Sequence, residues 1–136
     1  MTTSHPHVDA SGTMWNVGTA YDPKKGYSYA VVKYEKADPE WSGTMMIENG
    51  RTVCGIPARH KHSPAYFHSF GMTEDYVAFV EQPLFVDDVR NGMGGAGQAM
   101  NSQSLRWRKT EMVIRKVQLN LSGNSDIAFL TGMYIP

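Results

Sequence analysis

The chain has 136 residues, of which 41% are hydrophobic and 19% charged, as in a globular domain rather than a disordered segment. Thirteen Lys and Arg residues balance thirteen Asp and Glu residues, so the net charge gives no field that would capture nucleic acid or an anionic membrane. Cys54 is the single cysteine, which excludes an internal disulfide and a multi-cysteine zinc or iron–sulfur site.

The sequence shows no targeting or membrane-spanning signal. Residues 1–8 lack the apolar run of a signal peptide, and no run of about 18 apolar residues occurs. A lone cysteine also favours a reducing compartment. We therefore expect a cytoplasmic protein.

Turn-forming residues divide the first half of the chain into short β-strands. Residues 9–12 are turn formers between Pro6-His7-Val8 and the β-favouring run 13–17, which predicts a hairpin. A second turn at 22–26 precedes a strand at 28–34, whose residues are aromatic and β-branched.

The next strands are expected on either side of further turns. Asn49-Gly50 favours a tight hairpin between strands at 44–47 and 51–56. Strands are also expected at 65–70 and 76–81. The second of these lacks polar alternation, which predicts burial on both faces, and Pro83 follows it and should end the ladder.

The second half is dominated by a Gly-rich polar stretch. Residues 91–104 have too few apolar side chains to pack and are expected to form an exposed loop. Strands are expected afterwards at 105–107 and 112–121, with a last apolar run at 127–134. Short strands at this spacing with no amphipathic helix predict an all-β fold, leaving sandwich, barrel and propeller open.

Two histidine patterns are candidates for chemistry. His5-Pro6-His7 places imidazoles at i and i+2, which point to the same side of an extended chain and can reach one metal ion. His68 lies among apolar residues, where an imidazole needs a hydrogen bond or a metal. Taken alone, the two patterns are better explained by a solvent-exposed histidine pair and by a hydrogen-bonded core histidine than by a metal site.

Two other motifs are set aside on chemical grounds. Arg59-His60-Lys61-His62 alternates histidines, but its two cations repel a metal, so we expect a solvated loop. Residues 92–97 match GxGxxG formally, yet no strand runs directly into them and no clear helix follows.

Two extended phrases resemble the carotenoid cleavage oxygenases, in the branch of the animal beta-carotene oxygenases and retinoid isomerases. The first is Ser4-His5-Pro6-His7-Val8-Asp9 with the Gly-Thr-Met-Trp-Asn-Val-Gly run of 12–18. The second is Tyr66-Phe67-His68-Ser69-Phe70-Gly71 with its continuation to Tyr76 and the Phe-Val-Glu-Gln-Pro-Leu run of 79–84. The resemblance covers residues 3–86 strongly and 105–117 faintly, and it is absent from 118–136.

The resemblance implies a fold and a metal site. Family members form a seven-bladed β-propeller that holds Fe(II) on four histidines and uses dioxygen to cleave a polyene double bond. The motif positions carry the first ligand onto His5 and the second onto His68, with His7 as a neighbour. The other two family ligands follow farther along, and no histidine occurs after His68.

We therefore expect a fragment of one to two blades that lacks two ligands and is inactive alone. Its expected parts are a propeller fragment at 1–86, a Gly-rich polar loop at 87–104 and a divergent tail with further strands at 105–136. A carotenoid or retinoid and dioxygen are the expected partners, with peripheral membrane contact reserved for the complete enzyme. A truncated relative that binds polyenes or partner proteins, and an unrelated small β domain, are the alternatives.

Overall fold

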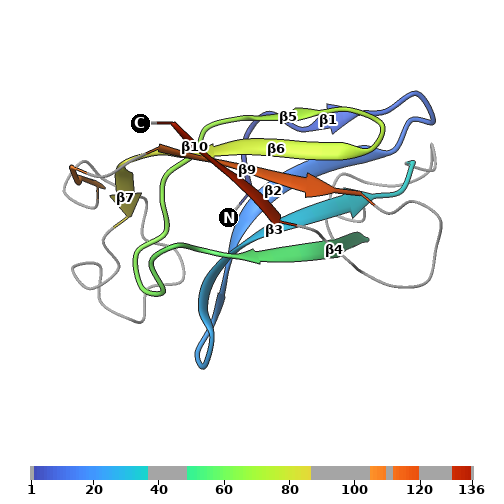
Figure 1. The fold of residues 1–136 in the computed structure, drawn as a ribbon. Coiled ribbons are helices and arrows are strands. Elements are labelled where there is room, and N and C mark those ends of the chain that lie inside the picture. The colour runs from blue at the N-terminus through green and yellow to red at the C-terminus, as the bar shows by residue number, and fades with distance from the viewer. Residues whose placement is uncertain (1, 37–48, 87–104, 110–111, 120–129, 136) are drawn as a thin grey trace.

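The first four strands form one antiparallel sheet with the strand order β1-β2-β3-β4 (Figure 1). The computed structural model describes residues 2–36, 49–86, 105–109, 112–119 and 130–135. The strands are β1 (His7–Val8), β2 (Met14–Asp22), β3 (Gly26–Tyr34) and β4 (Gly50–Pro57). Gly12 and Gly26 have φ of 87° and 88°, the left-handed conformation that tight turns between strands require. The hairpin predicted at 6–17 and the strand predicted at 28–34 are thus confirmed.

The second sheet has the order β10-β9-β6-β5, so strands distant in sequence lie side by side. A separate two-stranded sheet joins β7 to β8. The strands are β5 (Phe70–Met72), β6 (Tyr76–Glu81), β7 (Leu84–Val86), β8 (Leu105–Trp107), β9 (Met112–Gln118) and β10 (Leu130–Ile135). Because β9 pairs with both β6 and β10, the tail of the chain belongs to the same sheet as the second histidine phrase.

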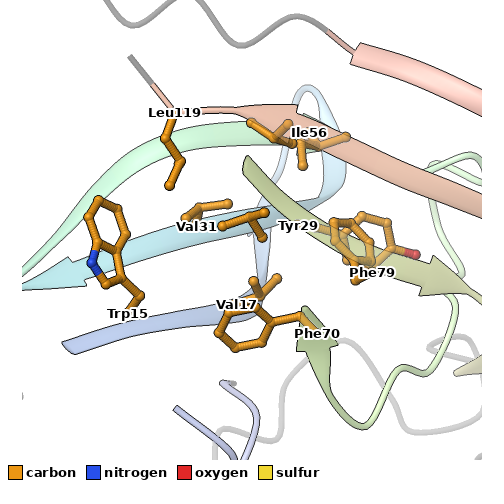
Figure 2. Close-up of a cluster of buried hydrophobic side chains, with 10 residues drawn as sticks. Trp15, Val17, Tyr29, Val31, Ile56, Phe70, Phe79 and Leu119 are labelled. Atoms are coloured by element: carbon orange, nitrogen blue, oxygen red, sulfur yellow. The ribbon is translucent and has the colours of Figure 1, made fainter. Parts of the chain in front are cut away.

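The hydrophobic core lies between these two four-stranded sheets. Val17 and Val31, which are direct cross-strand partners, come from the first sheet. Phe70 and Phe79, also cross-strand partners, come from the second. Figure 2 shows Tyr29 close to Phe79, whose ring centroid lies 4.9 Å away, and Leu119 and Trp15 at the opposite end of the cluster. Burial between two sheets supplies the main stabilisation that neither sheet would have alone.

The strand predicted at 65–70 is largely wrong. Only Ala65 forms an isolated bridge, to Phe85, and β5 begins at Phe70. Residues 65–69, the crossing segment, lead from a position beside β7 to the start of β5. The Tyr66 amide donates its hydrogen bond to the Leu84 carbonyl, 2.7 Å away, and not to the neighbouring strand of a regular ladder. Propensity predicted extended backbone here but could not predict which partner it would find.

Most of the remaining strand predictions are confirmed. The strand at 76–81 is central in its sheet, its side chains are buried or half-buried, and it ends before Pro83 as expected. The segment 51–56 lies within β4 and 105–107 is β8. The predicted strand 44–47 and loop 91–104 lie outside the described residues. Within the described part of the chain all regular structure is antiparallel β, and no helix could cross a membrane, which confirms the all-β class.

Candidate metal centre

His5 and His68 face each other although 63 positions separate them in the chain. Their Nε2 atoms are 2.8 Å apart, and the ring centroids are 4.6 Å apart at an interplanar angle of 55°. At that distance one imidazole carries its proton on Nε2 and donates it to the lone pair of the other. The two rings thus direct the same nitrogen atom at one point between them.

The N-terminal segment is fixed immediately before His5. The Thr3 amide donates to the Val17 carbonyl, 3.0 Å away, and Thr2 forms a bridge with Gly18. The Thr3 hydroxyl donates to Asn16 Oδ1 at 2.7 Å, and Asn16 Nδ2 donates to the Thr3 carbonyl at 2.9 Å. Since Asn16 is buried, these paired hydrogen bonds hold the segment against β2 and limit where His5 can lie.

His7 makes a different contact from His5. Its Nε2 donates to the Phe70 carbonyl at 2.9 Å, and its ring meets the Phe70 ring edge-on with centroids 4.6 Å apart. This nitrogen is therefore occupied in joining β1 to β5. The structure brings His5 and not His7 onto His68.

His68 is exposed, whereas the sequence predicts an imidazole surrounded by apolar side chains. The neighbouring Phe67 packs inward against Tyr29 and Phe79, with ring centroids 5.5 and 5.3 Å away. Phe67 thus packs against the core, whereas the next side chain, that of His68, is exposed to solvent. The role of a buried, hydrogen-bonded core histidine therefore does not apply to His68.

A buried charged network holds the segment that leads to His68. Glu81, 1% exposed, accepts hydrogen bonds from Tyr29 Oη at 3.0 Å, the Arg59 amide at 3.0 Å and Arg115 Nε at 2.8 Å. Tyr29 Oη in turn accepts from the Ala65 amide at 2.8 Å. Burial, and then the Glu81 charge, raise the pKa of the Tyr29 phenol far above its usual value, so it stays protonated. The sequence could not predict this network, because no local pattern indicates which side chains 22 to 52 residues apart will form hydrogen bonds with one another.

The Arg59–His62 run forms bends and a turn rather than a strand, as expected of it. His60 packs edge-on against Phe85 at 4.8 Å. Burial and the nearby Arg108 and Arg59 lower the pKa of His60, which favours a neutral ring. Lys61 and His62 are exposed, as a solvated loop predicts, whereas Arg59 and His60 are half-buried, so the prediction holds for only half of the run.

A cavity of about 220 Å³ lies beside the histidine pair. Its lining combines hydroxyls of the N-terminal segment with aromatic and aliphatic groups of the crossing segment. The lining residues are Thr2, Thr3, Ser4, Thr19, Ala65, Tyr66, Phe67, His68 and Val86. His68 therefore belongs to the histidine pair and also lines a cavity that a small apolar group can enter.

The donor set fits half of a metal site. Two nitrogen ligands at metal bonds of about 2.1 Å and a right angle lie roughly 3 Å apart, close to the 2.8 Å between the Nε2 atoms. Within the described ranges no three His, Cys, Asp or Glu side chains gather to hold a metal ion. The pair can therefore contribute two ligands, and a full coordination sphere needs further donors.

Fold and site together define an antiparallel β-protein that directs two imidazole nitrogens at one point. A family model described as retinal pigment epithelial membrane protein matches residues 1–118. The chain belongs to this family, that of the carotenoid oxygenases, as the resemblance of its two histidine phrases predicts.

Individual relatives agree with this assignment. The beta,beta-carotene 15,15'-dioxygenase of Rattus norvegicus is 40% identical over 89 residues, which cover 64% of this chain and 16% of the relative. The mitochondrial carotenoid-cleaving dioxygenase of Homo sapiens is 40% identical over 82 residues, 60% of this chain and 14% of the relative. The carotenoid isomerooxygenase of Drosophila melanogaster is 36% identical over 105 residues, 77% and 16% of the two chains. The matched part is thus about one sixth of the relatives' length.

Proposed function

We propose that this chain supplies two histidine ligands, His5 and His68, to the Fe(II) ion of a carotenoid-cleaving dioxygenase. The observation that carries the proposal is the 2.8 Å approach of their Nε2 atoms. Family membership and the carotenoid-acting names of the relatives support the same assignment. The substrate class is a carotenoid or retinoid polyene, cleaved with dioxygen, and the compartment is the cytoplasm.

The residues suit that chemistry. Neutral imidazoles are good ligands for Fe(II), and a ligand set without a carboxylate keeps the site's positive charge. The bound ion would supply activation of dioxygen. His5 and His68 would hold it, while His7 keeps its Nε2 on the Phe70 carbonyl and so fixes the strand next to the site.

The chain fits one to two blades of a seven-bladed propeller in this proposal. Each four-stranded antiparallel sheet has the strand number of a propeller blade. Because the described residues offer two ligands rather than four, we expect no appreciable turnover from this chain alone. Another part of the enzyme, or a second chain, would complete the site.

The test is anaerobic titration of the purified chain with Fe(II), followed by metal analysis. We expect one ion per chain, with binding reduced at least tenfold in His5→Ala and in His68→Ala, since each removes half of the donor set. His62→Ala is the matched control, because His62 is an exposed histidine on a turn. Equal binding by all four proteins would reject the proposed site.

The cavity beside His68 favours a second candidate, a truncated relative that binds polyenes without cleaving them. Such a protein would shift the visible absorption of an added polyene and retain that shift in His5→Ala. If the chain is instead a fragment of the iron enzyme, the wild-type chain should bind Fe(II), and His5→Ala should lose that binding.

A further inference from the structure

Tyr66 contacts the side of the His68 ring that faces away from His5. Its phenolic oxygen lies 3.0 Å from His68 Nδ1, and the ring centroids are 6.4 Å apart. The two residues are two positions apart in the crossing segment, and their side chains meet. His68 is therefore held at both ring nitrogens, by Tyr66 at Nδ1 and by His5 at Nε2.

The position of Tyr66 is set by its backbone. Its amide donates to the Leu84 carbonyl at 2.7 Å, and the preceding Ala65 both bridges to Phe85 and donates to Tyr29 Oη. Phe67, which follows, is inserted in the core against Tyr29 and Phe79. Tyr66 is consequently anchored on both sides, whereas the His68 ring is exposed and needs an external contact to fix it.

The hydrogen bond between Tyr66 and His68 is compatible with two tautomers of the His68 ring. If the phenol donates to Nδ1, His68 carries its proton on Nε2 and that nitrogen has no lone pair for a metal. If the phenol accepts from Nδ1–H, Nε2 keeps its lone pair and His5 donates to it. In general, the hydrogen bond at one ring nitrogen determines which nitrogen is free to bind a metal.

We propose that Tyr66 is a positioning residue for His68: its phenolic oxygen accepts a hydrogen bond from Nδ1–H, and this leaves Nε2 without a proton and directed at His5 and at the metal. The part of this inference that concerns the metal rests on the proposed function. The part that concerns the protonated nitrogen does not. Tyr66 touches the imidazole and acts through it.

The experiment reads the protonated nitrogen directly. Long-range ¹H–¹⁵N spectra of the metal-free chain with labelled histidine report which ring nitrogen of each residue carries the proton, with His68→Ala identifying the His68 signals. We expect His68 to carry its proton on Nδ1, and Tyr66→Phe to convert it to a mixture of both forms because water then accepts from either nitrogen. Tyr21→Phe, at a tyrosine on β2 whose ring packs on Tyr27, should leave the His68 spectrum unchanged.

A second measurement connects this state to metal affinity. Fe(II) binding, measured anaerobically, should weaken by roughly tenfold in Tyr66→Phe, the lower end of what loss of such a supporting hydrogen bond costs, since the contact is exposed. Thermal unfolding of both tyrosine variants separates this loss from a loss of folding. Unchanged binding with normal folding would count against the metal part of the inference.

The outcomes separate this inference from the proposed function. Protonation of His68 on Nε2 in the wild-type chain, or a spectrum that Tyr66→Phe does not alter, overturns the role of Tyr66 even if Fe(II) binds. Protonation of His68 on Nδ1 in the wild-type chain, with a mixture of both forms in Tyr66→Phe, upholds it. In that case, failure of the wild-type chain to bind Fe(II) would reject only the proposed metal site.

Discussion

Asp9 shows how one side chain can fix a turn next to the site. Its carboxylate accepts from the Ser11 hydroxyl at 2.6 Å and from Trp15 Nε1 at 2.9 Å, as well as from the amides of Ser11 and Thr13. The Ser11 hydroxyl, then the Trp15 indole, lower the pKa of Asp9 from 3.8 to about 2, against a smaller opposing effect of burial. The turn that returns the chain from β1 to β2 therefore depends on an ionised Asp9.

This carboxylate should make stability depend on pH in the acid range. A pKa lowered by folding contributes stability that is complete above about pH 4 and lost as the pH falls towards 2. Asp9→Asn should cost about 1 kcal/mol at pH 7, discounted for its access to solvent, and much less at pH 2. Urea unfolding at the two pH values measures this difference, with Glu74→Gln as an exposed control; equal losses at both pH values would contradict it.

The turn between β2 and β3 packs closely against the Lys61 backbone at Gly26 and Tyr27. The Tyr27 amide donates to the Lys61 carbonyl at 2.9 Å, and the Ala58 amide donates back to the Tyr27 carbonyl at 3.0 Å. A Cβ at Gly26 would overlap the Lys61 carbonyl oxygen, whereas at Gly12 it would meet only the flexible Lys36 side chain, 3.2 Å away. The two glycines share a left-handed φ but differ in what surrounds them.

This difference predicts unequal effects of the same substitution. Gly12→Ala should cost about 1 kcal/mol, the strain of a left-handed alanine. Gly26→Ala should cost more, about 2–3 kcal/mol, since the backbone at Lys61 must also shift. Chemical unfolding of both variants checks the order; a loss for Gly26→Ala no larger than that for Gly12→Ala would show that the contact yields easily.

Elements that depend on local signals could be predicted from the sequence, and those that depend on distant partners could not. The turn formers at 9–12 and 22–26 specify the first hairpins, and the apolar run at 76–80 specifies a central strand. The crossing segment at 65–69 has the composition of a strand, but its hydrogen bonds go to Leu84, Phe85 and Tyr29. His5 and His68 are candidates from their local patterns, but only the family phrases could assign them to one metal, because nothing local brings them together.

At the scale of the whole molecule, Glu81 joins the two sheets. Glu81 on β6 and Arg115 on β9 belong to the second sheet, while Tyr29 on β3 belongs to the first. Arg115 stands opposite Phe79 in the ladder and reaches diagonally to Glu81, and the pair is enclosed between the sheets. A charge pair in this position contributes little net stability when intact, but it leaves a buried charge when one partner is removed.

Glu81→Ala should therefore be among the most destabilising substitutions. It should lower the free energy of unfolding by about 3–5 kcal/mol, because it leaves the guanidinium of Arg115 and the hydroxyl of Tyr29 without their hydrogen-bond acceptor. The comparison pair is Lys33 with Glu35, also 2.8 Å apart but exposed at the surface, where Glu35→Ala should cost less than about 1 kcal/mol. Replacing both charges, as Glu81→Leu with Arg115→Met, should recover much of the loss, since no unpaired charge then remains. Denaturant unfolding of the wild type, Glu81→Ala, Glu35→Ala, Glu81→Leu, Arg115→Met and the double variant tests this. If the double variant loses as much as the sum of its single variants, the two charges are not coupled, and the sheets are joined by the apolar core alone.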